Sequence, residues 1–510
     1  MQKSFGSFLR RDGAHLLLLL VGAGLFIGGC FQNSQWFDEA YTVGLMHHSL
    51  VGVFHWATFD VHPHLYYVLL KLFTLLFGTS LPVMRLFSAL GGILFASLGY
   101  THLRRDFGKA VGFWFSFCVI FCSQTLAYAM AIRMYTWAAY FVALAAIYAY
   151  RMANQPSKRN RVLFLIFALC ASYTHYFGLF AAAMMQLLLL LRTRRRKESC
   201  RFWLVNSAIL LGAYLPGILV FLLQGAQGGA MWIRIEWPDL VFDLTSYPLL
   251  GDVLKVFFPR WEGSYFGIPY LIAGGVFLAL YITAGALLFR QMRREGRDEK
   301  RSQAVLWALR CYFGVVLFTV TVSLFRPLWY ARYSVVISGL LFFAMACLFA
   351  SFRKKLPKLL AAVLLLAVCG RMAYYHYDLF YDPSANAVME TLAPSGEAED
   401  RVQPSDVFLF DGTDTFNVTV WFPENDTYYF NNNHWNVQNA YRAFGPNVRV
   451  LDELDEADNT LLGGRVWTDG RGNCYEYLLS LGYTECTSHP IHLRYYDRSY
   501  EMILMVRTSE

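Results

Sequence analysis

The chain has 510 residues, of which 56% are hydrophobic and 17% aromatic, and its formal net charge is +8. This composition does not suit a single soluble domain and indicates many membrane-spanning segments. The charge is divided unevenly, because residues 1–374 carry +22 and residues 375–510 carry −14. The basic residues lie mostly in short gaps between apolar runs, as in the cytoplasmic loops of membrane proteins. We therefore expect membrane lipids as partners and no nucleic acid.

Eleven apolar runs follow one another along the chain, at 14–31, 81–101, 110–128, 134–150, 161–176, 178–191, 202–223, 266–290, 303–325, 333–351 and 357–374. Basic clusters occupy alternate gaps between them, near 104–109, 158–161, 192–197, 290–301 and 353–358. The positive-inside rule places these gaps and the N-terminus in the cytoplasm. The other gaps and the C-terminal domain are then expected outside the plasma membrane.

One apolar stretch does not fit this count. Residues 66–77 form a run of only 12 residues that contains Lys71, which is too short to cross a bilayer. Counting it as a span would invert every later loop against the charge rule. We expect an interfacial helix on the outer face, within a first outer loop of about 32–80.

The acidic C-terminal part predicts a small α/β domain. Runs of β-branched and aromatic residues predict strands at 406–410, 418–422, 427–430, 448–451, 465–467 and 502–506, and residues 475–481 predict a helix. The expected fold class is an all-α polytopic membrane protein of about eleven transmembrane helices, at 1–374, followed by a small extracytoplasmic α/β domain at 375–510. Cys474 and Cys486 lie in that domain, where they could form a disulfide or remain two thiols.

Candidate chemistry gathers in the predicted outer segments. Asp38 and Glu39 follow the first apolar run, where ionisable groups at a membrane surface are costly and tend to be functional. The same loop holds Asp60, His62, His64 and Tyr66, and later outer segments hold Arg133, Tyr135, His175, Arg234, Glu236, Arg326 and Arg332. Arginine forks suit phosphate oxygens, and a carboxylate suits a general base.

Each of these residues also has an ordinary structural explanation. An interfacial arginine can anchor to lipid headgroups, aromatic residues at span ends form belts, and a histidine such as His175 can simply pack. Asp38, His62 and His64 are the weak candidates for a metal, because no complete ligand set is visible. We therefore predict no certain cofactor, although a divalent metal stays open.

Several stretches resemble the signatures of GT-C glycosyltransferases, in that family's order over about 36–340. They are Phe37-Asp38-Glu39-Ala40-Tyr41, Asp60-Val61-His62-Pro63-His64-Leu65-Tyr66-Tyr67, Arg85-Leu86-Phe87-Ser88, Arg133-Met134-Tyr135, Tyr173-Thr174-His175-Tyr176 and Arg326-Pro327-Leu328-Trp329-Tyr330-Ala331-Arg332-Tyr333. The branch most similar comprises bacterial proteins like protein O-mannosyltransferases and lipid A aminoarabinose transferases.

The resemblance implies a catalytic membrane domain that transfers a sugar from a polyprenyl-phosphate donor. The configuration of the sugar's anomeric carbon would be inverted in the transfer. The acceptor would be the hydroxyl of an extracytoplasmic lipid, glycan or protein, and the transferred group a hexosyl or pentosyl unit. Asp38 corresponds to the family's general base. Two positions depart from the pattern: His64 replaces a second proline, and Ala131 replaces a glutamate two residues before Arg133, which leaves the donor sugar open.

The main alternative is a polytopic transporter or lipid flippase without transferase activity. Such a protein would place charges at mid-span on helices broken by Gly or Pro, often in repeated halves. The predicted spans contain few charges and no repeat is visible. A non-catalytic scaffold that presents the acidic domain is a third reading.

Overall fold

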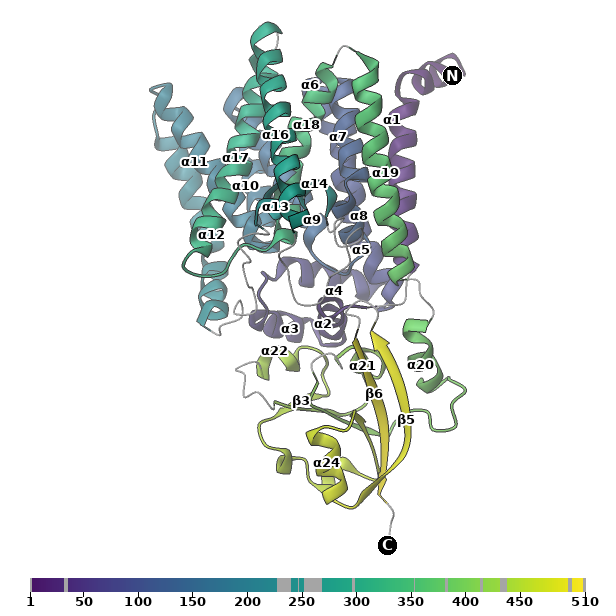
Figure 1. Ribbon diagram of the computed structural model, residues 1–510. Helices are drawn as coiled ribbons and strands as arrows, with labels where there is room; N and C mark the ends of the chain where they lie inside the picture. The colour runs from purple at the N-terminus through teal and green to yellow at the C-terminus, as the bar shows by residue number, and fades with distance from the viewer. Residues whose placement is uncertain are drawn as a thin grey trace. The chain divides into compact units, whose positions relative to one another are not determined.

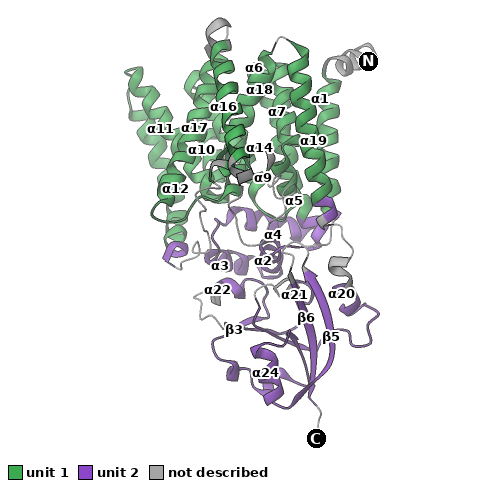
Figure 2. Cartoon of the chain, viewed as in Figure 1, with its two compact units in different colours: residues 1–30, 85–222, 230–375 green, residues 31–84, 223–229, 376–510 purple. Residues whose placement is uncertain are grey.

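The computed structural model describes residues 2–31, 35–226, 240–245, 247–251, 268–295, 299–352, 354–380, 384–412, 416–431, 438–493 and 498–507. The chain forms two compact units (Figure 2). Unit 1 comprises residues 1–30, 85–222 and 230–375, and unit 2 comprises residues 31–84, 223–229 and 376–510. The first outer loop and the C-terminal domain therefore belong to one unit, whereas the division at residue 374 into a catalytic and a soluble domain stays a prediction.

Unit 1 is a bundle of helices (Figure 1). Its elements are α1 (Gln2–Gly28), η1 (Gly29–Phe31), α5 (Leu81–Leu98), η3 (Gly99–Leu103), α6 (Arg104–Phe107), α7 (Lys109–Phe121), α8 (Ser123–Ala129), α9 (Tyr135–Asn154), α10 (Lys158–Thr174), α11 (Tyr176–Arg195), α12 (Arg201–Ala226), α13 (Leu240–Thr245), α14 (Tyr247–Leu250), α16 (Ile268–Glu295), α17 (Glu299–Ser323), η4 (Ala331–Ile337), α18 (Ser338–Ser351) and α19 (Lys355–Phe380). Helices this apolar and this long are typical of a protein that spans a membrane.

Seven helices among the described residues are long and apolar enough to cross a membrane, or eight if the bent pair α7 and α8 is one span. Three further predicted spans correspond to α9, α10 and α16, which are helical but less apolar or less completely described. The polytopic helical fold is confirmed, and the count of eleven spans stays a prediction.

Two of the predicted basic gaps and the N-terminal helix meet at one end of the bundle. Arg104 and Lys109 both pair with Asp12 at the start of the first span, at 2.8 and 3.4 Å. The Tyr150 hydroxyl donates to the Lys300 carbonyl at 2.8 Å, and Arg301 donates to the Phe107 carbonyl at 3.3 Å. The N-terminus and α6 lie at this same end in Figure 1. Basic gaps that are far apart in the sequence are therefore close together in the folded bundle.

Unit 2 begins with short helices in the segment predicted to be the first outer loop. They are α2 (Phe37–His47), α3 (Leu50–Trp56), η2 (Ala57–Phe59) and α4 (Leu65–Phe77). The 13-residue helix α4 is too short to span a membrane. It buries Tyr66, Leu70 and Lys71 and exposes Leu75, Leu76 and Phe77 at its C-terminal end, and apolar side chains exposed in this way suit the predicted interfacial helix.

The rest of unit 2 is a six-stranded sheet with order β3-β2-β1-β4-β6-β5. Its strands are β1 (Val407–Phe410), β2 (Thr427–Phe430), β3 (Val448–Leu451), β4 (Arg465–Asp469), β5 (Tyr483–Leu493) and β6 (Arg498–Arg507), and its helical segments are α20 (Ser384–Leu392), α21 (Phe416–Trp421), α22 (Gln438–Arg442), η6 (Leu454–Glu456), α23 (Asn459–Leu462) and α24 (Asn473–Ser480). Strands β1 to β4 pair in parallel, and β6 pairs antiparallel with β4 and β5.

Five predicted strands and the helix after residue 473 are confirmed, whereas the strand at 418–422 is wrong. That segment is the helix α21, because parallel strands β1 and β2 need a crossover between them. Sequence analysis also missed β5, whose Pro490 weakens the strand pattern. β5 lies at the edge of the sheet, where a strand tolerates proline.

The predicted alternative of a disulfide between Cys474 and Cys486 is wrong. Both residues are free thiols. Cys474 lies on α24 and is 1% exposed, packed in the core with Leu478 and Val466. Cys486 is exposed and sits in β5 where the register with β6 shifts. One side chain therefore points into the core and the other into solvent.

Candidate active site

The acid pair lies in the first turn of α2. Trp36 precedes the helix in an extended conformation, and its carbonyl accepts the backbone N–H groups of Glu39 and Ala40. Carboxylates near a helix N-terminus are stabilised by the helix dipole. Glu39 is 1% exposed, whereas Asp38 is only partly buried. The two carboxylates therefore occupy different environments, and Asp38 is the more accessible of the two.

A second acidic group follows η2. The Oδ2 atom of Asp60 accepts the Tyr67 hydroxyl at 2.5 Å and lies 3.4 Å from Nδ1 of His62. The His62 carbonyl in turn accepts the side-chain amide of Gln224 at 3.2 Å. His62 and Tyr67 are almost fully buried. This network fixes the Asp60-Val61-His62 turn, because a shared carboxylate oxygen holds two side chains at once.

His64 faces another neighbourhood. Its Nε2 is 3.0 Å from the Thr58 hydroxyl, and its ring stacks on Phe54 with centroids 4.7 Å apart. Burial lowers the pKa of His64, and the nearby Asp60 charge offsets this only in part. Among the residues that the structure describes, no group of three His, Cys, Asp or Glu side chains is placed to hold a metal ion.

Helix α4 packs against α2 and donates a hydrogen bond to its last turn. The Lys71 ammonium donates to the Met46 carbonyl at 2.7 Å in a buried position. Burial lowers the pKa of Lys71. A cation at the last turn of a helix stabilises the carbonyl groups there. Tyr66 is buried and packs edge-on against Tyr67, with ring centroids 5.8 Å apart, so it is part of this support rather than exposed.

The C-terminal domain also packs on α2. The Phe444 ring lies 5.1 Å from Phe37 and 5.4 Å from Tyr41, on either side of the acid pair in sequence. At Gly44, a Cβ atom would lie 2.0 Å from the Phe444 carbonyl oxygen. Burial lowers the pKa of His48, and the nearby backbone groups of Ala443 and Arg442 offset this only in part. The turn at 442–445 therefore fixes the helix that carries Asp38 and Glu39.

The arginine candidates lie in unit 1. Arg133 occupies the bend between α8 and α9 and is 2% exposed. The backbone of this bend is held because its carbonyl accepts the Ser88 hydroxyl at 3.4 Å. Thr136, at the start of α9, donates to the Ser88 carbonyl at 2.7 Å. A buried guanidinium in a fixed bend suits anion binding better than headgroup anchoring.

Tyr135 and His175 meet in one aromatic cluster. His175 separates α10 from α11 in an extended conformation, and its Nδ1 accepts the Phe177 N–H at 3.1 Å. Its ring lies 5.6 Å from that of Tyr135 and 4.9 Å from that of Tyr333. Arg332 lies over Tyr330 at 4.7 Å and is 8% exposed. The structure thus joins Tyr135, His175 and Arg332 through rings from three separate segments.

Other predicted residues fall outside this cluster. Arg326 follows α17 and is exposed, as a residue at a membrane surface would be. Arg234 and Glu236 lie outside the described residues. Ala131 is buried in the bend that precedes Arg133, and its carbonyl accepts the Arg133 N–H at 2.8 Å.

Comparison with known proteins rests on the fold alone. No protein-family model matches the chain, and no curated protein matches its sequence. ArnT from Cupriavidus metallidurans in the apo state is similar with a TM-score of 0.62 and 12% identity, over 98% of this chain and 100% of that chain. ArnT bound to undecaprenyl phosphate gives a TM-score of 0.54 and 11% identity, over 98% and 99%.

The chain has the GT-C fold. The fold expected from the sequence resemblance is therefore confirmed, including the small C-terminal domain. The assignment of single residues to substrate or to chemistry stays a prediction, because a similarity at this level of identity fixes the architecture and not the site.

The GT-C architecture surrounds the predicted residues with partners that sequence analysis missed. Arg85 is fully buried near the start of α5. It belongs to the stretch Arg85–Ser88, which resembles a GT-C signature, but it was not among the predicted site residues. Tyr67 holds Asp60, and Tyr333 joins Tyr135 to His175. Tyr67 and Tyr333 directly follow the predicted residues Tyr66 and Arg332, and Arg85 lies in a stretch that resembles a GT-C signature. Only long-range packing distinguishes these tyrosines from the many belt tyrosines.

Proposed function

We propose that this protein is an inverting membrane glycosyltransferase that moves a sugar from a polyprenyl-phosphate donor to an extracytoplasmic hydroxyl acceptor. The observation that carries the proposal is a GT-C fold over nearly the whole chain with Asp38 partly accessible in the first turn of α2. ArnT, which shares the fold, has been solved with undecaprenyl phosphate. That ligand supports a polyprenyl-linked donor for this chain.

The chemistry is a single displacement. Asp38 accepts the proton of the acceptor hydroxyl while that oxygen attacks the anomeric carbon. The bond between the anomeric carbon and the phosphate oxygen breaks, and the electron pair leaves with polyprenyl phosphate. Attack opposite to the departing group inverts the anomeric centre. Glu39, being buried, positions the first turn of α2 rather than receiving the proton.

The departing phosphate needs cationic hydrogen-bond donors. Arg133 and Arg332 are the best placed, since both are buried in unit 1 beside fixed backbone or aromatic rings. Arginine binds phosphate through two parallel N–H groups. We assign Tyr135 and His175 to donor binding with them, and Asp60, His62 and Tyr66 to acceptor binding, with buried Tyr66 acting through its neighbour Tyr67. Exposed Arg326 is assigned to the lipid headgroup region.

The proposal includes an orientation in the plasma membrane. The basic end of unit 1 faces the cytoplasm together with the N-terminus, and the sheet domain faces the outside. A cysteine introduced at residue 440 is then labelled by an impermeant thiol reagent in intact cells, and one introduced at residue 296 is not. Reversed labelling would place Asp38 in the cytoplasm and refute the assignment.

The decisive experiment uses purified protein and a panel of polyprenyl-phosphate sugars, with release of polyprenyl phosphate as the readout. The wild type releases it in the presence of a suitable acceptor, and Asp38→Asn loses about 10²–10⁴-fold in rate while still binding donor lipid. Glu39→Gln is the matched control, with a milder loss of rate and a larger loss of thermal stability. If both variants are inactive and a chelator inactivates the wild type, a metal shares the site. Undiminished turnover by Asp38→Asn would refute its role as base.

A further inference from the structure

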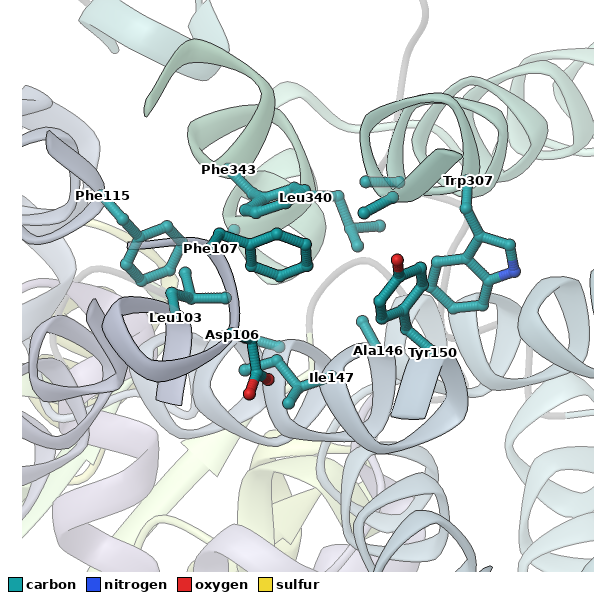
Figure 3. Close-up of a pocket in the computed structure, with 14 residues that line it drawn as sticks. Leu103, Asp106, Phe107, Phe115, Ala146, Ile147, Tyr150, Trp307, Leu340 and Phe343 are labelled. Carbon is teal, nitrogen blue, oxygen red and sulfur yellow. The ribbon is translucent and has the colours of Figure 1, made fainter. Parts of the chain in front are cut away.

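The helices of unit 1 enclose a pocket that plays no part in the chemistry proposed above. It lies between α6, α7, α9, α17 and α18 and opens to the surface of unit 1, so its space of about 490 Å³ includes open solvent (Figure 3). Along α9 the pocket extends from Tyr150 to Ala143, seven residues or about 10 Å at 1.5 Å per residue. It therefore reaches from the basic end of unit 1 toward the middle of the helix bundle.

The pocket wall is apolar. Small side chains, among them Ala143, Ala146 and Gly339, leave the space, and aromatic rings border it. Phe107 and Phe343 pack with centroids 4.9 Å apart, and Tyr150 and Trp307 lie across from them in Figure 3. A wall of small and aromatic apolar side chains suits a hydrocarbon chain.

Water is a poor occupant. The Tyr150 hydroxyl already donates to the Lys300 carbonyl at 2.8 Å. The Asp106 carboxylate accepts from Arg151 at 2.7 Å, and the Trp307 indole nitrogen points away from the rings of Tyr150 and Phe107 (Figure 3). A buried water needs two to four polar partners. The wall offers few, so a hydrocarbon chain fits better.

Cations surround the mouth of the pocket. Asp106 is neutralised by Arg151 at 2.7 Å and by Arg105 at 3.5 Å. Lys300 is exposed, with its ammonium 6.0 Å from the Phe107 ring, and Arg301 donates to the Phe107 carbonyl at 3.3 Å. Among the described side chains, cations outnumber acids at this mouth. A negatively charged headgroup would therefore be attracted to it.

We propose that this pocket binds one hydrocarbon chain of an anionic phospholipid, with the headgroup on Lys300 and Arg301. The lipid would fill the space between α9, α17 and α18 at the basic end of unit 1. The pocket shares no lining residue with Arg133 or with the aromatic cluster of Tyr135, His175 and Tyr333, so we expect its occupancy to be independent of donor binding.

Native mass spectrometry of the full-length protein in detergent tests the proposal, with phosphatidylglycerol, phosphatidylcholine or glycerol phosphate added. The wild type retains phosphatidylglycerol, retains phosphatidylcholine less, and does not retain glycerol phosphate. Ala146→Phe fills the pocket and abolishes the retained lipid. Lys300→Glu weakens phosphatidylglycerol binding about fivefold or more, since each basic residue near a membrane surface contributes ~1 kcal/mol.

Two control variants keep the result specific. Ala213→Phe adds the same side chain on the exposed face of α12, and Lys355→Glu reverses a charge at the exposed start of α19. Both retain phosphatidylglycerol like the wild type. If Ala146→Phe fails to fold, Lys300→Glu still tests whether the headgroup binds at this mouth. Lys300 is exposed, so its substitution should leave the fold intact. Equal retention by Lys300→Glu and the wild type would overturn the headgroup assignment, and equal retention by a folded Ala146→Phe would overturn the pocket itself.

Discussion

The contact between Gly44 and Phe444 predicts that a single methyl group in α2 impairs transfer. In Gly44→Ala the new Cβ would lie 2.0 Å from the Phe444 oxygen and 2.4 Å from its carbonyl carbon. Ordinary van der Waals contact begins at 3.4 Å. The obstacle is backbone rather than a flexible side chain, so α2 and the turn at 442–445 must separate by about 1.4 Å.

The free energy of folding falls by a moderate amount in this variant. Overpacking costs ~1–3 kcal/mol, while alanine stabilises a helix interior by ~1 kcal/mol relative to glycine. The net loss is therefore at most ~2 kcal/mol. The position of Asp38 is affected more, because it lies at the other end of the same helix. A misplacement of about 1 Å can lower a rate by ~10²-fold.

The assay compares release of polyprenyl phosphate, donor-lipid affinity and thermal unfolding in Gly44→Ala and the wild type. We expect a rate loss of up to ~10²-fold, unchanged donor affinity and a small shift of the melting temperature. Gly212→Ala is the matched control, since a Cβ at Gly212 in α12 meets nothing within 4 Å. Equal rates for Gly44→Ala and Gly212→Ala would refute the idea that the C-terminal domain positions α2.

Three further predictions concern other parts of the molecule. Arg133→Lys should weaken donor affinity while expression stays normal, because lysine keeps the charge and loses the bidentate fork. Unchanged affinity would show that Arg133 does not bind the donor phosphate and is a lipid anchor instead. Burial, and then the charge of Asp411, raise the pKa of Asp469 to about 7. The folded domain therefore holds a proton that the unfolded chain releases near pH ~4, so its stability should fall as pH rises from about 4 to 7, and Asp469→Asn should flatten that dependence in thermal unfolding. Exposed Cys486 should react with a thiol reagent in the native protein and buried Cys474 only after unfolding, as mass spectrometry would show.

Much of the membrane part could be predicted from the sequence, because its determinants are local. Apolar length and loop charge depend on neighbouring residues alone, and the pairing of Arg104 with Asp12 agrees with them. The short helix α4 was likewise predicted from its length. In the sheet domain, the segment 418–422 has the local pattern of a strand and becomes a helix, because the parallel partners on either side require a crossover.

The candidate site could be predicted only in part, because its packing joins residues far apart in the chain. The sequence indicates that adjacent carboxylates point in different directions, but not which one is buried. Glu39 is buried and Asp38 is only partly buried, in a helix that contacts Phe444, four hundred residues later. The same holds for Tyr135 and Tyr333, which stack at 6.4 Å across two hundred residues. Short motifs therefore identified residues that can carry chemistry, whereas the environment that would assign a role to each of them arises from contacts that no local pattern encodes.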